Sequence, residues 1–164
     1  MDALVIDAFE FCRLGERREG RVAVADLPRL SAECVDTAVM LEWTLQGGIG
    51  ALGYPRRTMS VSAAVQLVCQ RCLLPFSFEM RTESVLFLAS SEQQADEIED
   101  QLGDEEIDVI VGSKAVAILD LIEDDALLAL PLSPRHEVCP GASALEVLKE
   151  GKPSPFAALK KIRQ

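Results

Sequence analysis

The sequence predicts an α+β protein in which an antiparallel β-meander packs against one main amphipathic helix. Two observations carry this prediction: three segments with alternating apolar residues over 36–88, and one helical apolar pattern over 115–131. Short connections between consecutive strands favour antiparallel pairing. The chain has 164 residues, of which 49% are hydrophobic and 26% charged. We therefore expect one domain that spans residues 1–164.

The first predicted strand covers residues 36–46. There Val39, Leu41 and Trp43 alternate with polar residues, which is the period of a strand with one buried face. The next nine residues, GGIGALGYP at 47–55, contain four glycines and a proline. That composition predicts a loop.

Two further strands follow this loop. Apolar side chains alternate from Met59 to Leu67, which predicts a strand that runs into Cys69. The pattern resumes after Pro75 and continues over 76–88. The short connection between these two strands predicts a β-hairpin.

The charge of the chain is unevenly distributed. The net charge is −11. Nine acidic residues and no Lys or Arg lie from Glu92 to Asp108, so the rest of the chain holds 18 acidic against 16 basic residues. The low hydrophobicity of this segment predicts a mobile acidic loop over 91–108. Because both ends of the chain are basic, the charge pattern is compatible with binding to the phosphate backbone of a nucleic acid despite the overall negative charge.

The main helix is predicted within AVAILDLIEDDALLALP, residues 115–131, and ends at Pro131. Its expected core face consists of Ile118, Leu121, Ile122 and Leu128. Its acidic residues are interpreted as a solvated face and not as a metal or acid–base site; they are Asp120, Glu123, Asp124 and Asp125. The tail, residues 132–164, is predicted to be irregular, with short helices at 142–150 and after Pro155.

Two cysteines, Cys69 and Cys72, form a CxxC motif in the predicted hairpin turn. About 64 residues later, His136 and Cys139 repeat the two-residue gap. Zinc in structural sites takes four Cys or His ligands, and a turn between strands aims both sulfurs at one point. These four residues are therefore candidate zinc ligands.

Two alternatives stay open for the cysteines. In one, Cys69 and Cys72 are small buried apolar residues and His136 lies on the surface. In the other, the CxxC motif is the active site of a thiol-disulfide oxidoreductase, although no helix follows it to lower a thiol pKa. No other catalytic or cofactor-binding constellation is found, and we predict a protein that is not an enzyme.

Compartment and partners follow from the same composition. Five cysteines without a dense framework indicate a reducing compartment, and no apolar run reaches the roughly 18 residues that span a bilayer. We therefore expect a cytoplasmic protein without membrane contact. Candidate partner-binding residues are the basic Arg17, Arg18, Arg71, Lys160 and Lys161, together with Phe156 in the tail.

Several segments together resemble the YceD-type large ribosomal RNA subunit accumulation proteins of bacteria and plants. The resemblance rests on VCQRCLLPF after a strand, an acidic segment, LIEDDALLALPLSP and the near-terminal PSPFAALKKI, in that order over residues 60–164. GERREGRVAVADLPRL is more loosely similar. Some members carry additional cysteines after the helix, where this chain has only His136 and Cys139.

The resemblance implies a non-enzymatic role in the synthesis, processing or stability of 23S ribosomal RNA. It also implies a gene that commonly neighbours that of a large-subunit ribosomal protein. Two mechanisms fit the charge pattern. Either the basic ends contact ribosomal RNA, or the acidic segment and helix face hold a basic large-subunit ribosomal protein as a chaperone does.

Overall fold

The computed structural model describes residues 5–103 and 108–141 of the chain. In chain order its elements are β1 (Val5–Ile6), α1 (Ala8–Leu14), β2 (Arg17–Ala23), the 3-10 turn η1 (Val24–Asp26), α2 (Pro28–Glu33), β3 (Met40–Ile49), the 3-10 turn η2 (Ala51–Gly53), β4 (Pro55–Val68), β5 (Pro75–Ala89), α3 (Glu92–Leu102), β6 (Asp108–Val111), β7 (Val116–Ala117) and α4 (Ile118–Ala129). The predicted tail helices lie outside the described residues. Among those described, no helix combines the length and the apolar character needed to cross a bilayer.

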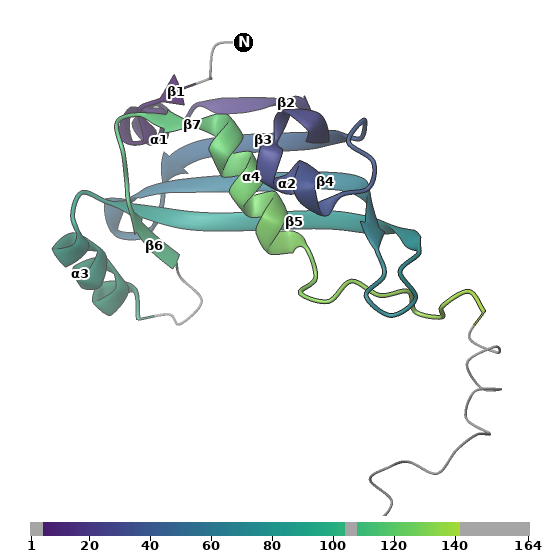
Figure 1. The fold of residues 1–164 in the computed structure, drawn as a ribbon. Helices are drawn as coiled ribbons and strands as arrows, with labels where there is room; N and C mark the ends of the chain where they lie inside the picture. The colour runs from purple at the N-terminus through teal and green to yellow at the C-terminus, as the bar shows by residue number, and fades with distance from the viewer. Residues whose placement is uncertain (1–4, 104–107, 142–164) are drawn as a thin grey trace, which may run out of the picture.

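A five-stranded sheet in the order β2-β3-β4-β5-β6 forms the centre of the molecule (Figure 1). Strands β3 to β5 pair antiparallel, which confirms the predicted meander, and β2, which was not predicted, adds a further antiparallel strand beside β3. β6 pairs parallel to β5, with α3 in the connection. A parallel neighbour needs such a crossover, whereas a hairpin joins antiparallel strands directly. β1 and β7 form a separate two-stranded sheet.

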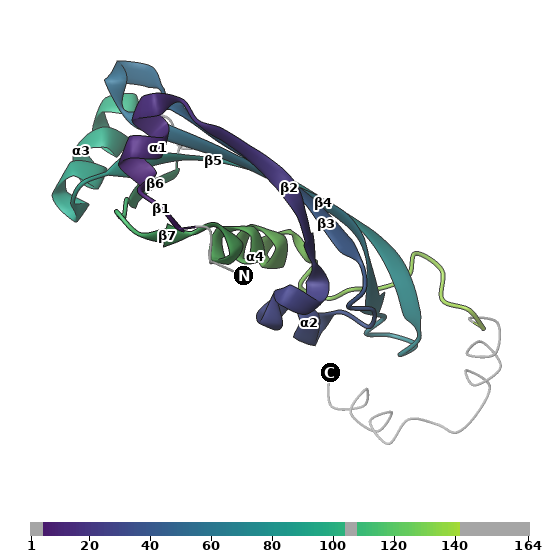
Figure 2. The same cartoon turned by 90° about the horizontal axis from the view of Figure 1, so that it is seen from above.

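One face of the sheet is covered by α2 and α4, which lie on the same side of the curved strands (Figure 2). The predicted core rows of the strands point to this face, including Leu41 and Leu45 of β3 and Met59 of β4, all fully buried. From α4 they meet Ile118 and Ile122, which are four residues apart and therefore share one side of the helix. The α+β class is confirmed.

The expected loop at 47–55 is shorter than predicted, because β3 runs on to Ile49. Gly47 makes this continuation possible. A Cβ at this position would lie 2.6 Å from the backbone oxygen of Phe11 in α1. Here the glycine serves the close approach of a helix to a strand, and not a turn.

The acidic segment was wrongly predicted to be a loop over 92–102, where the chain forms α3. Ser91 caps its first turn, and Gly103 ends the helix in the left-handed conformation with φ 58°. Ala95 and Ile98 are buried against Phe87 of β5. Leu102 of the same helix packs against this cluster too, so a short apolar stripe docks the helix although its average composition is strongly polar.

The predicted faces of α4 need three corrections. Leu128, expected in the core, is 84% exposed, and Glu123, expected in solvent, is only 4% exposed. Asp125 is buried as well. The reason for the burial of Glu123 is α2, which packs against this side of α4 and presents its N-terminal N–H groups there.

The Glu123 carboxylate caps α2 from another part of the chain. It accepts hydrogen bonds from the backbone N–H of Arg29 at 2.6 Å and of Leu30 at 3.1 Å, and from Nε of Arg29 at 2.8 Å. Burial by itself would raise the pKa of Glu123, but the bonds from Leu30 and Arg29 outweigh it and hold the pKa below its usual range.

Candidate metal centre

The turn between β4 and β5 carries the first two candidate ligands. The N–H of Cys69 donates to the carbonyl of Leu74, and the N–H of Leu73 donates to the carbonyl of Cys69, both at 2.9 Å. Leu73 adopts the left-handed conformation with φ 62°, which is uncommon for a residue other than glycine. These constraints turn the sulfurs of Cys69 and Cys72 towards one region.

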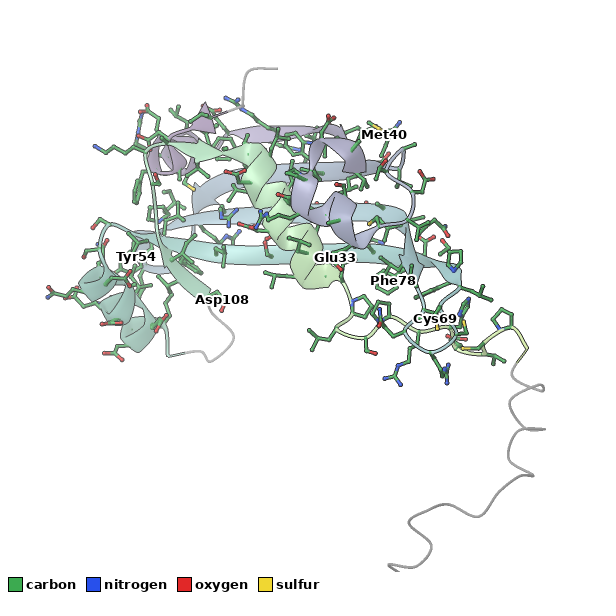
Figure 3. All side chains as sticks on the ribbon, in the orientation of Figure 1. Glu33, Met40, Tyr54, Cys69, Phe78 and Asp108 are labelled. Carbon is green, nitrogen blue, oxygen red and sulfur yellow. The ribbon has the colours of Figure 1, made fainter. Side chains whose placement is uncertain are left out.

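The second pair of ligands comes from the segment that follows α4, which passes alongside this turn. The two segments are joined by hydrogen bonds from the N–H of Gln70 to the carbonyl of Pro134, at 2.8 Å, and from Nη2 of Arg71 to the carbonyl of His136, at 2.6 Å. Figure 3 labels Cys69 where the turn and this segment lie together. Tertiary structure thus brings the CxxC and HxxC motifs together.

The four candidate ligands converge on one point. The Sγ atoms of Cys69, Cys72 and Cys139 and a ring nitrogen of His136 all lie within 4.8 Å of one another. The Sγ atoms of Cys69 and Cys139 are 3.8 Å apart, and Sγ of Cys72 is 3.3 Å from Nδ1 of His136. Tetrahedral zinc with ordinary bond lengths needs about 3.8 Å between two sulfurs and about 3.5 Å between sulfur and nitrogen. The arrangement fits a closed Cys3His site, and all five cysteines are free.

The thiols differ in acidity. Burial raises the pKa of Cys69, but hydrogen bonds from the backbone of Cys72, His136 and Arg71 and from the imidazole lower it to about 5. The backbone of Leu74 lowers the pKa of Cys72, but burial and the neighbouring thiols outweigh this and raise it. The lowered pKa favours the thiolate form of Cys69, and thiolate is the form that binds metal.

Two residues around the cluster orient its ligands. Nε of Arg71 donates to Sγ of Cys139 at 3.2 Å, so this guanidinium adds positive charge beside a sulfur. The ring of Phe76 lies against that of His136, with centroids 5.0 Å apart and planes at 42°. Phe76 was identified in the sequence only as a strand residue. Only its place next to the turn reveals this contact.

The other partner-binding candidates are dispersed. Arg17 pairs with Glu19, and Arg18 pairs with Glu16, both within or beside β2. Through β3, Arg17 lies level with Thr58 of β4, whereas the cysteine turn follows the opposite end of that strand. Phe156, Lys160 and Lys161 lie outside the described residues. The structure therefore does not join Arg17 and Arg18 to Arg71 in one surface.

The sequence of the chain is similar to that of known proteins. The sequence model of the family described as "Large ribosomal RNA subunit accumulation protein YceD" matches residues 58–163, which include all four candidate ligands. The chain belongs to this family. It is 28% identical over 153 residues to the "Large ribosomal RNA subunit accumulation protein YceD" of Haemophilus influenzae, covering 88% of this chain and 86% of that protein. No solved structure matches.

Membership confirms the resemblance seen in the motifs. The description of the YceD family connects it with accumulation of the RNA of the large ribosomal subunit and names no reaction. The four-residue cluster, now placed within the family's matched segment, is the part of this structure with the most distinctive chemistry.

Proposed function

We propose that this chain is a non-enzymatic ribosome-biogenesis factor of the bacterial cytoplasm, which supports the synthesis, processing or stability of 23S ribosomal RNA and is held together by structural zinc. The observation that carries the zinc is the convergence of four ligand atoms within 4.8 Å. Cys69, Cys72, His136 and Cys139 would hold the ion. A bound zinc supplies a cross-link between the β4–β5 turn and the segment after α4.

The closed ligand set supports a structural role. Catalytic zinc keeps a coordination position for water or substrate, whereas structural zinc has four protein ligands. Here Cys69, Cys72, His136 and Cys139 would supply all four ligands, and Arg71 adds its contact to Cys139 from outside. This geometry supports a scaffold for a binding surface and not a site for chemistry.

The same geometry disfavours a thiol-disulfide oxidoreductase. Its attacking cysteine must be reached by a substrate disulfide and lies at a helix N-terminus. Cys69 is fully buried, and the motif connects two strands. The lowered pKa of Cys69 arises from backbone and imidazole hydrogen bonds within the cluster, as expected of a metal ligand.

The test combines metal content with function in cells. Protein purified without chelator should contain about one zinc per chain, as a four-ligand site binds one ion. Cys139→Ala should lose the zinc and should fail to restore 23S ribosomal RNA in cells that lack the protein. Cys34→Ala is the matched control, because Cys34 lies outside the cluster. It should keep both zinc and rescue.

Two results would contradict the proposal in different ways. A wild-type protein that folds normally without stoichiometric zinc would remove the metal and leave the cysteines as buried thiols. Full rescue by a zinc-free Cys139→Ala chain would show that the ribosomal role does not need the site.

A basic large-subunit ribosomal protein is a second candidate for the direct partner, and α3 favours it. The helix exposes Glu92, Asp96 and Glu99 at positions i, i+4 and i+7, which share one side. Among the described residues, none of these three forms an ion pair. By contrast, Arg17 and Arg18 are already paired with acids of this chain, which weakens the case for RNA at that surface.

Binding assays distinguish the two partners. The wild-type protein is titrated with bare 23S ribosomal RNA and with purified basic large-subunit proteins. Replacing Glu92, Asp96 and Glu99 by their amides should weaken binding to the basic protein. The salt dependence of RNA binding should not become steeper. The matched control replaces Glu79, Glu83 and Asp120, which are also exposed. An equal loss of affinity for the basic protein in both variants would show that only net charge matters. Tight binding to RNA without binding to the basic proteins would favour the RNA mechanism.

A further inference from the structure

A buried arginine occupies a core position at the opposite end of β4 from the cysteine turn. Side chains of a strand alternate between its faces, so Arg57 must point to the same side as Met59 and Val61. These two apolar residues are fully buried, and Arg57 itself is only 8% exposed. The guanidinium of Arg57 therefore lies on the core face of β4, at the end of the row of buried apolar side chains.

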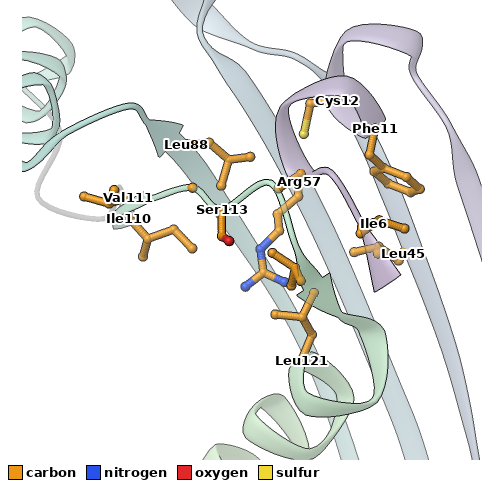
Figure 4. A pocket seen from close by; sticks show the side chains of 13 residues that line it. Ile6, Phe11, Cys12, Leu45, Arg57, Leu88, Ile110, Val111, Ser113 and Leu121 are labelled. Atoms are coloured by element: carbon orange, nitrogen blue, oxygen red, sulfur yellow. The ribbon is translucent and has the colours of Figure 1, made fainter. Parts of the chain in front are cut away.

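Arg57 lines a cavity of about 90 Å³ between α1, the sheet and the β6–β7 connection. Figure 4 shows its guanidinium pointing between Ile6, Leu45, Ser113 and Leu121. The walls are mostly aliphatic or aromatic, and Ser113 is exposed at the rim, where the cavity reaches solvent. The cavity is therefore an apolar chamber with one cationic group inside it.

The guanidinium lacks a full set of partners within the described part of the chain. Its Nη1 atom is buried there without a hydrogen-bond acceptor. The acid with the largest effect on it is Asp125, whose Oδ2 instead accepts a hydrogen bond from Ser84 at 2.6 Å. The thiol of Cys12, also in the wall, donates to the carbonyl of Arg56. Since a buried donor without an acceptor is costly, the site is matched to an acceptor from outside.

The chamber selects the chemistry of that acceptor. A single guanidinium balances one negative charge and presents two parallel N–H groups, which match a carboxylate. Phosphate would bring more charge than the apolar walls and one cation can hold. A cavity of 150 Å³ takes benzene, so about 90 Å³ suits roughly four non-hydrogen atoms.

We propose that this cavity binds the carboxylate of a short aliphatic acid, with Arg57 on the carboxylate and the aliphatic walls around its carbon atoms. The carboxylate is either that of a free acid with two or three carbons or the C-terminal group of a peptide that ends in a small apolar residue. No reaction is attached to this binding. The site is separate from the zinc ligands and does not depend on the proposed ribosomal role.

The test uses propionate as the probe and NMR as the measurement. Propionate should shift the methyl signals of Ile6, Leu45 and Leu88 in a saturable way, with half-saturation on the order of millimolar. Propionamide has nearly the same shape without the charge, and should bind about tenfold more weakly or worse. N-acetylalanine represents a peptide C-terminus, and phosphate represents a non-carboxylate anion.

Arg57→Met removes the charge and should weaken propionate by about tenfold or more. Arg56→Met is the matched control, because Arg56 is the adjacent residue of β4 and its side chain is exposed. It should bind propionate like the wild type. Tighter binding of N-acetylalanine than of propionate would assign the site to a peptide end, and the reverse would assign it to a free acid.

Three results would overturn the proposal. Wild-type protein that shows no saturable shift with either carboxylate lacks the site. Equal affinity for propionamide would reduce it to an apolar cavity, and tighter binding of phosphate would assign it another ligand class. None of these results requires the variant to fold.

Discussion

The two ends of β4 hold polar groups on the core side of the sheet in opposite ways. Beyond Val68, the atoms of Cys69, Cys72, His136 and Cys139 satisfy one another and Arg71 within a few ångströms. Near Pro55, Arg57 enters a cavity in which its Nη1 has no acceptor among the described residues. The first cluster is closed, whereas the second is open to a further group.

The comparison shows that the role of a buried polar group depends on whether the protein itself supplies its partners. A closed set of four candidate metal ligands would leave no coordination position for a substrate, so we expect it to contribute to stability and shape. An open cation in an apolar chamber destabilises the empty protein and binds a complementary anion. Helix α4 lies across the same face and carries two buried acids: Glu123 accepts bonds from the N-terminus of α2, and Asp125 accepts one from Ser84 and acts on the charge of Arg57.

Loss of the metal should have the largest effect on stability. Cys69→Ser, or chelation of the wild-type protein, should lower the melting temperature by about 10 °C. This corresponds to about 4 kcal/mol at the size of this chain. The reason is that the turn and the segment after α4 lose their cross-link. Thermal unfolding followed by circular dichroism measures it, with Cys34→Ala, which removes a thiol outside the cluster, as the control for the smaller cost of losing a partly buried sulfur. A shift below about 2 °C would show that the closed end does not need zinc.

Removal of the Glu123 carboxylate should rank second. Glu123→Ala leaves the buried N–H of Leu30 without an acceptor, at a cost of about 2–3 kcal/mol in the free energy of unfolding. Asp120→Ala on the same helix is the control, because Asp120 is exposed, and should stay within about 0.5 kcal/mol. Urea unfolding gives both values. Equal effects would mean that α2 does not depend on this cap.

Arg57→Met should change stability least among these substitutions, or raise it by about 1 kcal/mol. Replacing a poorly paired buried charge by an apolar side chain of similar length is often neutral or stabilising. If the open end were closed by an ion pair, the same change would cost about 3–5 kcal/mol. Urea unfolding therefore distinguishes an open from a closed arrangement, and a loss in that range would abolish the contrast between the two ends.

The two buried acids of α4 should respond to pH in opposite directions. The folded pKa of Glu123 is lowered, so its contribution is present above the unfolded value of about 4.3 and is lost as pH falls through the folded pKa. Burial raises the pKa of Asp125, and the bond from Ser84 and the charge of Arg57 only partly offset this. Its contribution is present below the unfolded value of about 3.9 and is lost as pH rises.

The effect is small and is tested by measuring the free energy of unfolding between about pH 3 and pH 7 for the wild type, Glu123→Gln and Asp125→Asn. This range includes the pKa values of both carboxyls in the unfolded chain. Relative to wild type, Glu123→Gln should become less stable as pH rises, and Asp125→Asn more stable. Parallel curves would show that the two carboxyls share one environment after all.

Much of the central architecture follows from local pattern. The period-two rows around Leu41, Met59 and Met80 predict the meander, and the period of Ile118 and Ile122 predicts α4. The two-residue gaps also predict the four candidate metal ligands. The elements before β3 were not predicted, although Asp7, which caps α1, and Pro28, in the first turn of α2, mark the starts of two of them.

The sequence by itself determined the antiparallel strands, the main helix, the family and the two cysteine motifs, because each depends on spacing within a few residues. Tertiary structure decided that α3, despite its polar composition, docks on β5, and it alone decided that Glu123 is buried and that Arg57 enters a cavity. Ile98 docks on Phe87, and Glu123 caps a helix 94 residues away, at Arg29. In both cases a different segment of the chain decides whether the residue is buried. The spacing of apolar residues within one helix or strand does not reveal which other segment packs against it.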